Sequence, residues 1–83
     1  MQTPDAVSAL SALAHDGRLA VFRLLVKAGK DGLAAGEIAR RLDSLPNTLS
    51  ASLTILSKAG LATSRREGRS IVYAANYTRM TRL

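Results

Sequence analysis

The sequence predicts a mostly helical domain that ends in a small β-hairpin. Three observations lead to this fold class: apolar residues recur at helical spacing through residues 6–56, the pattern becomes extended after Leu61, and a Glu67-Gly68 pair interrupts the extended stretch. Hydrophobic residues make up 47% of the 83 residues but aromatic residues only 4%. We therefore expect a core of Leu, Ile, Val and Ala side chains between packed helices.

Two helices are predicted near the N-terminus. Thr3-Pro4-Asp5 is a typical helix start, because Thr can cap a helix, Pro fits the first helical position and Asp is favourable at the positive end of the dipole. Asp16 is expected to cap the second helix, which should stop near Gly29. The residues expected to face the core are Ala6, Val7, Leu10, Leu13 and Ala14 in the first helix, and Leu19, Phe22, Leu25 and Val26 in the second.

A third helix is predicted over about residues 35–42 and a fourth over about residues 46–59. The two are separated because the residue before Pro46 is pushed out of the helical region. Gly60 is expected to cap the fourth helix in the left-handed conformation. The inner face of the third helix is predicted to hold Ile38, Ala39 and Leu42.

The hairpin is predicted from two extended segments, residues 62–66 and 69–74, around a Glu67-Gly68 turn. Asn76 can cap a final segment in which apolar residues recur every three positions. This segment is too short for an isolated helix to be stable, so we expect it to be the start of a longer one. Residues 1–83 are interpreted as one domain.

Charge is concentrated towards the C-terminus. The chain carries a net charge of +6, and the segment 57–83 holds six Lys or Arg against one acid, whereas residues 1–56 hold six against five. A locally concentrated basic balance favours a phosphate-rich partner. Double-stranded DNA is therefore a candidate partner.

Several functional classes are disfavoured by what the sequence lacks. It contains no Cys and one His, His15, so we predict no disulfide, no metal site and no cofactor. His15 is interpreted as a residue of a helix junction. An enzyme would need a nucleophile with its base, a pair of acids in a cleft, or a phosphate-binding loop, and the sequence indicates none of these. No long apolar run or secretion signal is present, so we expect a cytoplasmic protein without membrane contact.

The order of the predicted elements is that of a winged helix-turn-helix: two helices joined by a short turn, then a basic hairpin. In this arrangement the second helix of the pair enters the major groove. Leu49, Leu53 and Leu56 fall within one narrow arc of that helix and must face the core. The opposite arc is small, polar and free of acids, and it could read base edges. The residues predicted to contact DNA from this helix are Pro46, Asn47, Thr48, Ser50, Ala51, Thr54 and Lys58.

The hairpin adds three arginines, Arg65, Arg66 and Arg69, around its turn. Guanidinium groups suit phosphate contacts or the minor groove, so all three are predicted DNA contacts. Because side chains alternate along a strand, only some can point towards DNA, while the others pair with Glu67 or lie along the surface.

Several segments resemble the ArsR family of dimeric repressors. Residues 13–25 are similar to the second helix of that family, in which an LAH-x-x-RL pattern leads into apolar residues. The further matching segments are residues 36–42, 45–50, 56–61 and 66–73, so that the resemblance covers about residues 9–80.

The resemblance implies a homodimeric repressor that binds a palindromic operator. The fourth helix of each protomer would lie in the major groove with its wing alongside. The first and last helices of such proteins usually form the dimer interface, which here implicates Val7, Leu10, Tyr77, Met80 and Leu83.

The chain also departs from the family pattern. Many members carry a metal-binding Cys pair on the third helix, whereas residues 33–37 hold no thiolate or imidazole. Ser52 stands where the matching subgroup often has His. The residues therefore identify no inducer.

Two alternatives remain open: a winged helix that contacts another protein, or a DNA binder that responds to no ligand. A protein-contact module should expose apolar surface on the fourth helix. Ile55 is the only large apolar residue near that face, and we expect it to lie beneath the hairpin.

Overall fold

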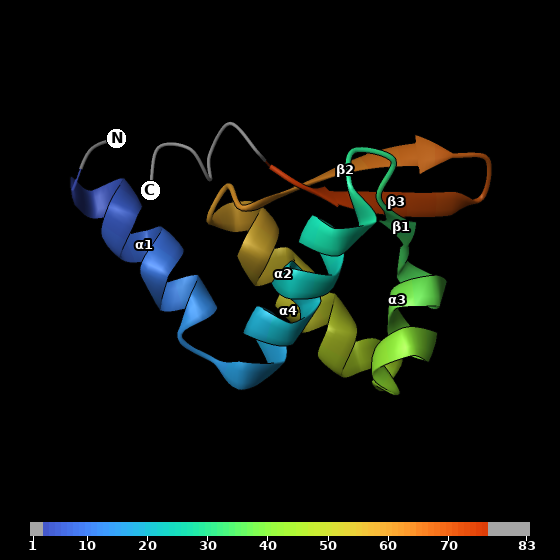
Figure 1. Cartoon of the computed structure of the whole chain (residues 1–83), viewed down its shortest axis with the longest axis horizontal. Coiled ribbons are helices and arrows are strands. Elements are labelled where there is room, and N and C mark those ends of the chain that lie inside the picture. Colours follow the sequence, from blue (N-terminus) through green and yellow to red (C-terminus); the bar gives the residue numbers. More distant parts are fainter. Residues whose placement is uncertain (1–2, 77–83) are drawn as a thin grey trace.

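The computed structural model describes residues 3–76, which form four helices and a three-stranded antiparallel sheet (Figure 1). The element order is α1 (Thr3–Leu13), α2 (Asp16–Ala28), β1 (Leu33–Ala34), α3 (Ala35–Leu42), α4 (Pro46–Lys58), β2 (Ala62–Glu67) and β3 (Ser70–Ala75). The sheet lies along one side of the helices, with its β2–β3 end projecting beyond them. The predicted fold class is thus confirmed, with one strand more than expected. The predicted interface residues Tyr77, Met80 and Leu83 lie outside the described residues.

The core lies where α2, α3 and α4 meet the sheet. Its fully buried large side chains are Leu25, Ile38, Leu56 and Leu61, one from each of the three helices and one from the segment before β2. Burying an aliphatic side chain of this size contributes roughly 1.5–3 kcal/mol. Of the predicted inner residues of the second helix, Phe22 and Leu25 are buried, Val26 packs against the core while partly buried, and Leu19 is only half-buried.

The inner face predicted for α1 is wrong. Val7 and Leu10 are 57% and 61% exposed, whereas Ala9 and Ala12 are buried against the core. Two small side chains let α1 approach both α2 and α4 closely. Leu13 packs at the edge of the core as predicted.

The start of α2 also differs from the prediction. His15, not Asp16, is the capping residue: its backbone is extended, and its Nδ1 accepts a hydrogen bond of 3.2 Å from the amide of Gly17. Asp16 lies in the first helical turn, where a carboxylate is favourable at the positive end of the dipole. The interpretation of His15 as a helix-junction residue is confirmed.

The third strand, β1, was not predicted. Strand β3 lies at the centre of the sheet, with β1 on one side and β2 on the other. Leu33 pairs with Tyr73, and Ala34 with Val72. A segment of two residues is too short to show the alternation of a strand in the sequence. Strand β1 is defined only by its pairing with β3.

The hairpin turn lies one residue further along than predicted. Glu67 pairs with Ser70, so the loop consists of Gly68 and Arg69. Gly68 has a φ of 61°, and glycine at the first loop position with positive φ fits a type II′ turn. Arg69 is therefore a turn residue and not, as predicted, the first residue of a strand.

Within residues 3–76, no helix is both long enough and apolar enough to cross a membrane.

Candidate nucleic-acid interface

A tight turn sets the angle between α3 and α4. Asp43 adopts the left-handed conformation with a φ of 49°, and the amide of Ser44 donates to the carbonyl oxygen of Ala39 at 3.0 Å. This hydrogen bond ends α3. Leu45 is extended, and Pro46 occupies the start of α4, where its missing N–H costs no hydrogen bond.

The two faces of α4 are those that the sequence predicts. Leu49, Leu53 and Leu56 are at most 3% exposed and pack in the core. Ser52 is also buried. Every α4 residue predicted to contact DNA is exposed: Pro46, Asn47, Thr48, Ser50, Ala51, Thr54 and Lys58. The outward face of α4 carries no acidic side chain.

The end of α4 fixes where the hairpin begins. Gly60 has a φ of 77°, and the amides of Gly60 and Leu61 donate to the carbonyl oxygens of Ser57 and Leu56. This double hydrogen bond is a Schellman motif, and the predicted role of Gly60 is confirmed. The Asn76 side chain returns from the end of β3 and donates to the Gly60 carbonyl at 2.9 Å. Both ends of the hairpin are thus attached to the end of α4.

The three hairpin arginines fall into two groups. Arg65 pairs across the sheet with Val72, so both side chains lie on one face. Its guanidinium bonds to the Glu67 carboxylate and to the Asp31 carbonyl oxygen, the latter at 2.6 Å. Because β3 lies between β2 and β1, the bond to Asp31 joins β2 to the segment that precedes β1 on the far side of β3.

Arg66 and Arg69 remain available for a partner. Both are exposed, and neither takes part in an ion pair found among residues 3–76. Arg66 lies opposite Ile71, which is 45% exposed, on the other face of the hairpin from Arg65. The DNA contacts predicted for the three arginines therefore rest on two free guanidinium groups and one that is already bonded.

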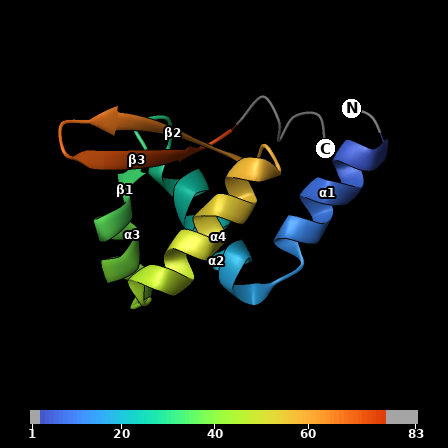
Figure 2. The same ribbon diagram turned by 180° about the vertical axis from the view of Figure 1, so that it is seen from behind.

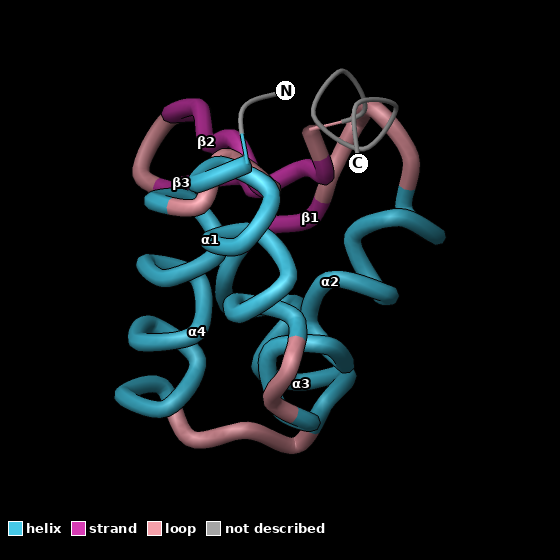
Figure 3. The backbone as a smooth tube through the Cα atoms, turned by 90° about the vertical axis from the view of Figure 1, so that its left-hand side faces the viewer, coloured by secondary structure: helices cyan, strands magenta, loops and turns pink. Residues whose placement is uncertain are grey.

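Helix α4 and the hairpin lie on the same side of the molecule. In Figure 2, α4 runs across the front of the helices with the hairpin above one end of it. In Figure 3, α4 and the β2–β3 hairpin again lie together on the left, with α2 on the right. The exposed face of α4 and the free arginines of the hairpin can thus meet one partner.

Ile55 does not lie beneath the hairpin, so that expectation is wrong. It is 38% exposed and lines a hollow with Ala12 of α1 and Arg18 of α2. The helical rotation from Leu53 and Leu56 turns Ile55 towards α1 rather than towards the sheet.

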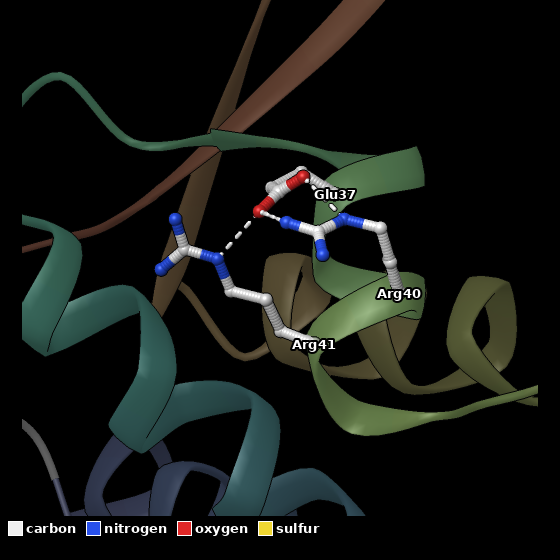
Figure 4. A network of polar contacts seen from close by, with 3 residues as sticks. All are labelled: Glu37, Arg40 and Arg41. Atoms are coloured by element: carbon white, nitrogen blue, oxygen red, sulfur yellow. Dashed lines mark hydrogen bonds and ion pairs between the residues drawn. The ribbon is translucent and has the colours of Figure 1, made fainter.

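An ion-pair network on α3 was missed in the sequence (Figure 4). The Glu37 carboxylate accepts from Nε of Arg40 at 3.0 Å and from Nε of Arg41 at 2.6 Å. The signal was available, since residues three and four apart are neighbours on a helix. The hydrogen bonds from Arg40 and then Arg41 lower the pKa of Glu37 to about 2, and Glu37 in turn raises the pKa of Arg40.

Replacing Glu37 by Gln should lower stability in a pH-dependent way. The folded-state pKa is about 2 and the ordinary value is 4.5, so the stabilisation is complete above about pH 4.5 and disappears as the pH falls towards 2. The difference in unfolding free energy between the original chain and Glu37→Gln should shrink over that range in urea denaturation. Arg40→Gln, which removes the largest cause of the shift, should weaken the same pH dependence. Parallel pH profiles of the original chain and Glu37→Gln would contradict this assignment.

Within the described part of the chain, no group of three or more His, Asp or Glu side chains could hold a metal ion.

Known proteins resemble this chain in sequence. The family model described as a helix-turn-helix domain matches residues 13–65. A protein of Halobacterium salinarum that carries the name arsenical resistance operon repressor ArsR is 40% identical over 63 residues. That match covers 76% of this chain, and this chain spans about half of that relative, 48% of its length.

Solved structures resemble the chain as well. HlyU from Vibrio cholerae is 30% identical, with a TM-score of 0.79 over 92% of this chain and 82% of that one. The homodimeric winged helix-turn-helix DNA-binding domain of Mb0332 from Mycobacterium bovis is 30% identical, with a TM-score of 0.83 over 95% and 70%. An ArsR-like transcriptional regulator from Rhodococcus sp. RHA1 is 25% identical, with a TM-score of 0.84 over 95% and 72%.

The family match, the shared order of helices and wing, and the position of the resembling segments agree with one another. This family consists of transcriptional regulators and is not a class of enzymes. The chain belongs to the ArsR family of winged helix-turn-helix transcriptional regulators.

Proposed function

We propose that this protein is a homodimeric repressor that binds a palindromic operator in double-stranded DNA. Each protomer would place α4 in the major groove and the wing, residues 62–74, against the adjacent backbone. The proposal rests on one observation: α4 and the hairpin lie on the same side of the molecule (Figure 3). The exposed face of α4 carries no acid, and the hairpin carries Arg66 and Arg69 without an ion pair among the described residues.

The outward face of α4 is suited to base edges. Asn47 can pair with adenine, Thr54 can bond to either kind of edge, and the methyl of Ala51 can touch thymine. All three side chains are exposed. Small side chains also let the helix axis approach the floor of the groove closely. Lys58, at the end of α4, would contact phosphate.

The test is a titration of the protein against its own promoter DNA and a scrambled duplex at two salt concentrations, followed by fluorescence anisotropy. We expect tighter binding to the promoter, with an affinity that falls steeply as salt rises. Asn47→Ala and Thr54→Ala should each reduce the preference for the promoter while leaving the salt dependence unchanged. Equal affinity for both duplexes in the original chain would argue against sequence-specific regulation.

Exposed apolar side chains on α1 support the dimer. Val7 and Leu10 are large, apolar and more than half exposed, and such side chains gather at protein interfaces. The Mb0332 domain is described as homodimeric. A two-fold axis would bring each residue into the interface twice.

Leu10→Ser should therefore weaken the dimer strongly. Losing the burial of one leucine costs roughly 1.5–3 kcal/mol. Because a symmetric dimer loses two leucines at its interface, the dissociation constant of the dimer should rise by about a hundredfold or more. Sedimentation equilibrium measures this change. Leu45→Ser is the matched control, because Leu45 is 74% exposed and precedes α4, away from α1. An unchanged dissociation constant in Leu10→Ser would remove α1 from the interface.

A further inference from the structure

A hollow between α1 and the end of α4 combines two cations with an apolar floor. It has a volume of about 300 Å³, and the residues that line it are Ser11, Ala12, Arg18, Ile55, Lys58 and Ala59. That volume lies at the lower end of the range for small-molecule sites. Helix α1 packs against α4 here, so the two sides of the hollow belong to different helices (Figure 2).

Arg18 is held in place before any ligand arrives. Its Nε donates to the Ala12 carbonyl oxygen at 2.7 Å, and its Nη2 donates to the Ser11 carbonyl oxygen at 3.3 Å. These carbonyls orient the guanidinium but do not neutralise it, and its remaining N–H groups are left for an acceptor. A cation held in this way loses little freedom when it binds an anion.

Lys58 faces the same hollow from α4. The ion pairs found among residues 3–76 involve neither Lys58 nor Arg18. The two positive charges therefore lack a local carboxylate. Ile55 lines the same hollow and is 38% exposed, so it adds apolar surface beside the two cations. The charges favour an anion, and the apolar floor favours a ligand with an apolar body.

We propose that this hollow binds a small organic monocarboxylate with a short apolar or aromatic body. The carboxylate would bridge Arg18 and Lys58, and the apolar body would cover Ile55 and Ala12. A bare phosphate would leave that floor exposed to water. If the proposed function holds, the ligand would also compete with DNA for Lys58 and so weaken operator binding.

Binding is tested without DNA, so the result does not depend on the proposed function. Benzoate is titrated into the isotope-labelled protein at constant ionic strength, and amide shifts are followed by NMR. We expect saturable shifts at Ser11, Ile55, Lys58 and Ala59. Benzamide, which has the same body without the charge, should produce none. Inorganic phosphate should bind at least about tenfold more weakly than benzoate.

Variants assign the site. Lys58→Gln should raise the benzoate dissociation constant about tenfold, and Ile55→Ser should raise it as well. Lys27→Gln is the matched control, since Lys27 lines a second basic hollow, of about 310 Å³, between α2 and α3. The other cation of this second hollow, Arg23, is exposed and is not held by any hydrogen bond found in the described residues. Lys27→Gln should therefore leave the benzoate dissociation constant unchanged.

Three results would overturn the proposal: shifts that never saturate, benzamide binding as tightly as benzoate, or an equal loss of affinity in Lys27→Gln. Binding of phosphate as tightly as benzoate would also contradict it, because the hollow would then select negative charge and not an apolar body. The effect on DNA is measured separately, by repeating the anisotropy titration with benzoate. Loss of promoter affinity in the original chain, but not in Ile55→Ser, is the expected result.

Discussion

Replacing Arg66 and Arg69 together by alanine should lower the affinity for every DNA sequence by about a hundredfold at low salt, because each loses a charge-assisted hydrogen bond. Neither side chain is bonded within the described protein, so no internal contact is lost with it. The logarithmic dependence of affinity on salt should become shallower by about two units, one for each phosphate contact. Anisotropy titrations over a salt series measure both quantities.

The matched control is the pair Arg23→Ala and Lys27→Ala. This variant lowers the net charge by the same amount, but its substitutions lie on α2, where both residues line a hollow with Leu42 of α3 and not with the hairpin. If the arginines of the hairpin contact DNA, the control should keep most of the salt dependence. Equal losses in both variants would mean that net charge, and not the position of the wing, attracts DNA.

Arg65→Ala tests whether the bonded arginine of the hairpin behaves differently from the free Arg66 and Arg69. Since the Arg65 guanidinium is bonded to Glu67 and Asp31, its removal should change the salt dependence by less than one unit. The variant should instead lose stability, because the Asp31 carbonyl loses its hydrogen-bond donor and Glu67 loses its ion pair.

Local patterns predicted the helices and the buried and exposed faces of α4. The boundaries of α3 and the buried arc of Leu49, Leu53 and Leu56 follow from 3.6-residue periodicity and from the break before Pro46. These signals lie within a few residues of one another. The α4 face, the hairpin and the family resemblance could therefore be found from the sequence alone.

Features that depend on distant residues could not be predicted. Arg65 bonds to Asp31, 34 positions away, and nothing near Arg65 in the sequence indicates that acceptor. The inner face of α1 was predicted wrongly because two of its large apolar residues, Val7 and Leu10, lie on the exposed side. Packing against α2 and α4 selected Ala9 and Ala12 over Val7 and Leu10, because small side chains permit close contact between helices.

Strand β1 is the clearest case of a non-local feature, and Gly32 makes it possible. Gly32 precedes β1 with a φ of 72°, and a Cβ at this position would lie 2.3 Å from the Tyr73 carbonyl oxygen and 3.1 Å from Cγ1 of Val72. The first neighbour is backbone at the centre of the sheet. It cannot move without disturbing the pairing of β3 with β1.

Gly32→Ala should therefore reduce the free energy of unfolding by about 3 kcal/mol, from positive φ and from overpacking together. Gly68→Ala is the matched control: its φ of 61° is also positive, but a Cβ there would meet nothing within 4 Å, so the expected loss is only about 1 kcal/mol. Urea denaturation followed by circular dichroism compares the two variants.

Equal losses of stability would mean that conformation alone, and not contact with β3, requires glycine at position 32. A larger loss in Gly32→Ala would show that contact with the backbone of β3 adds to the conformational cost. Because Asp31 is the neighbouring residue, the same variant should also release Arg65 and loosen the wing.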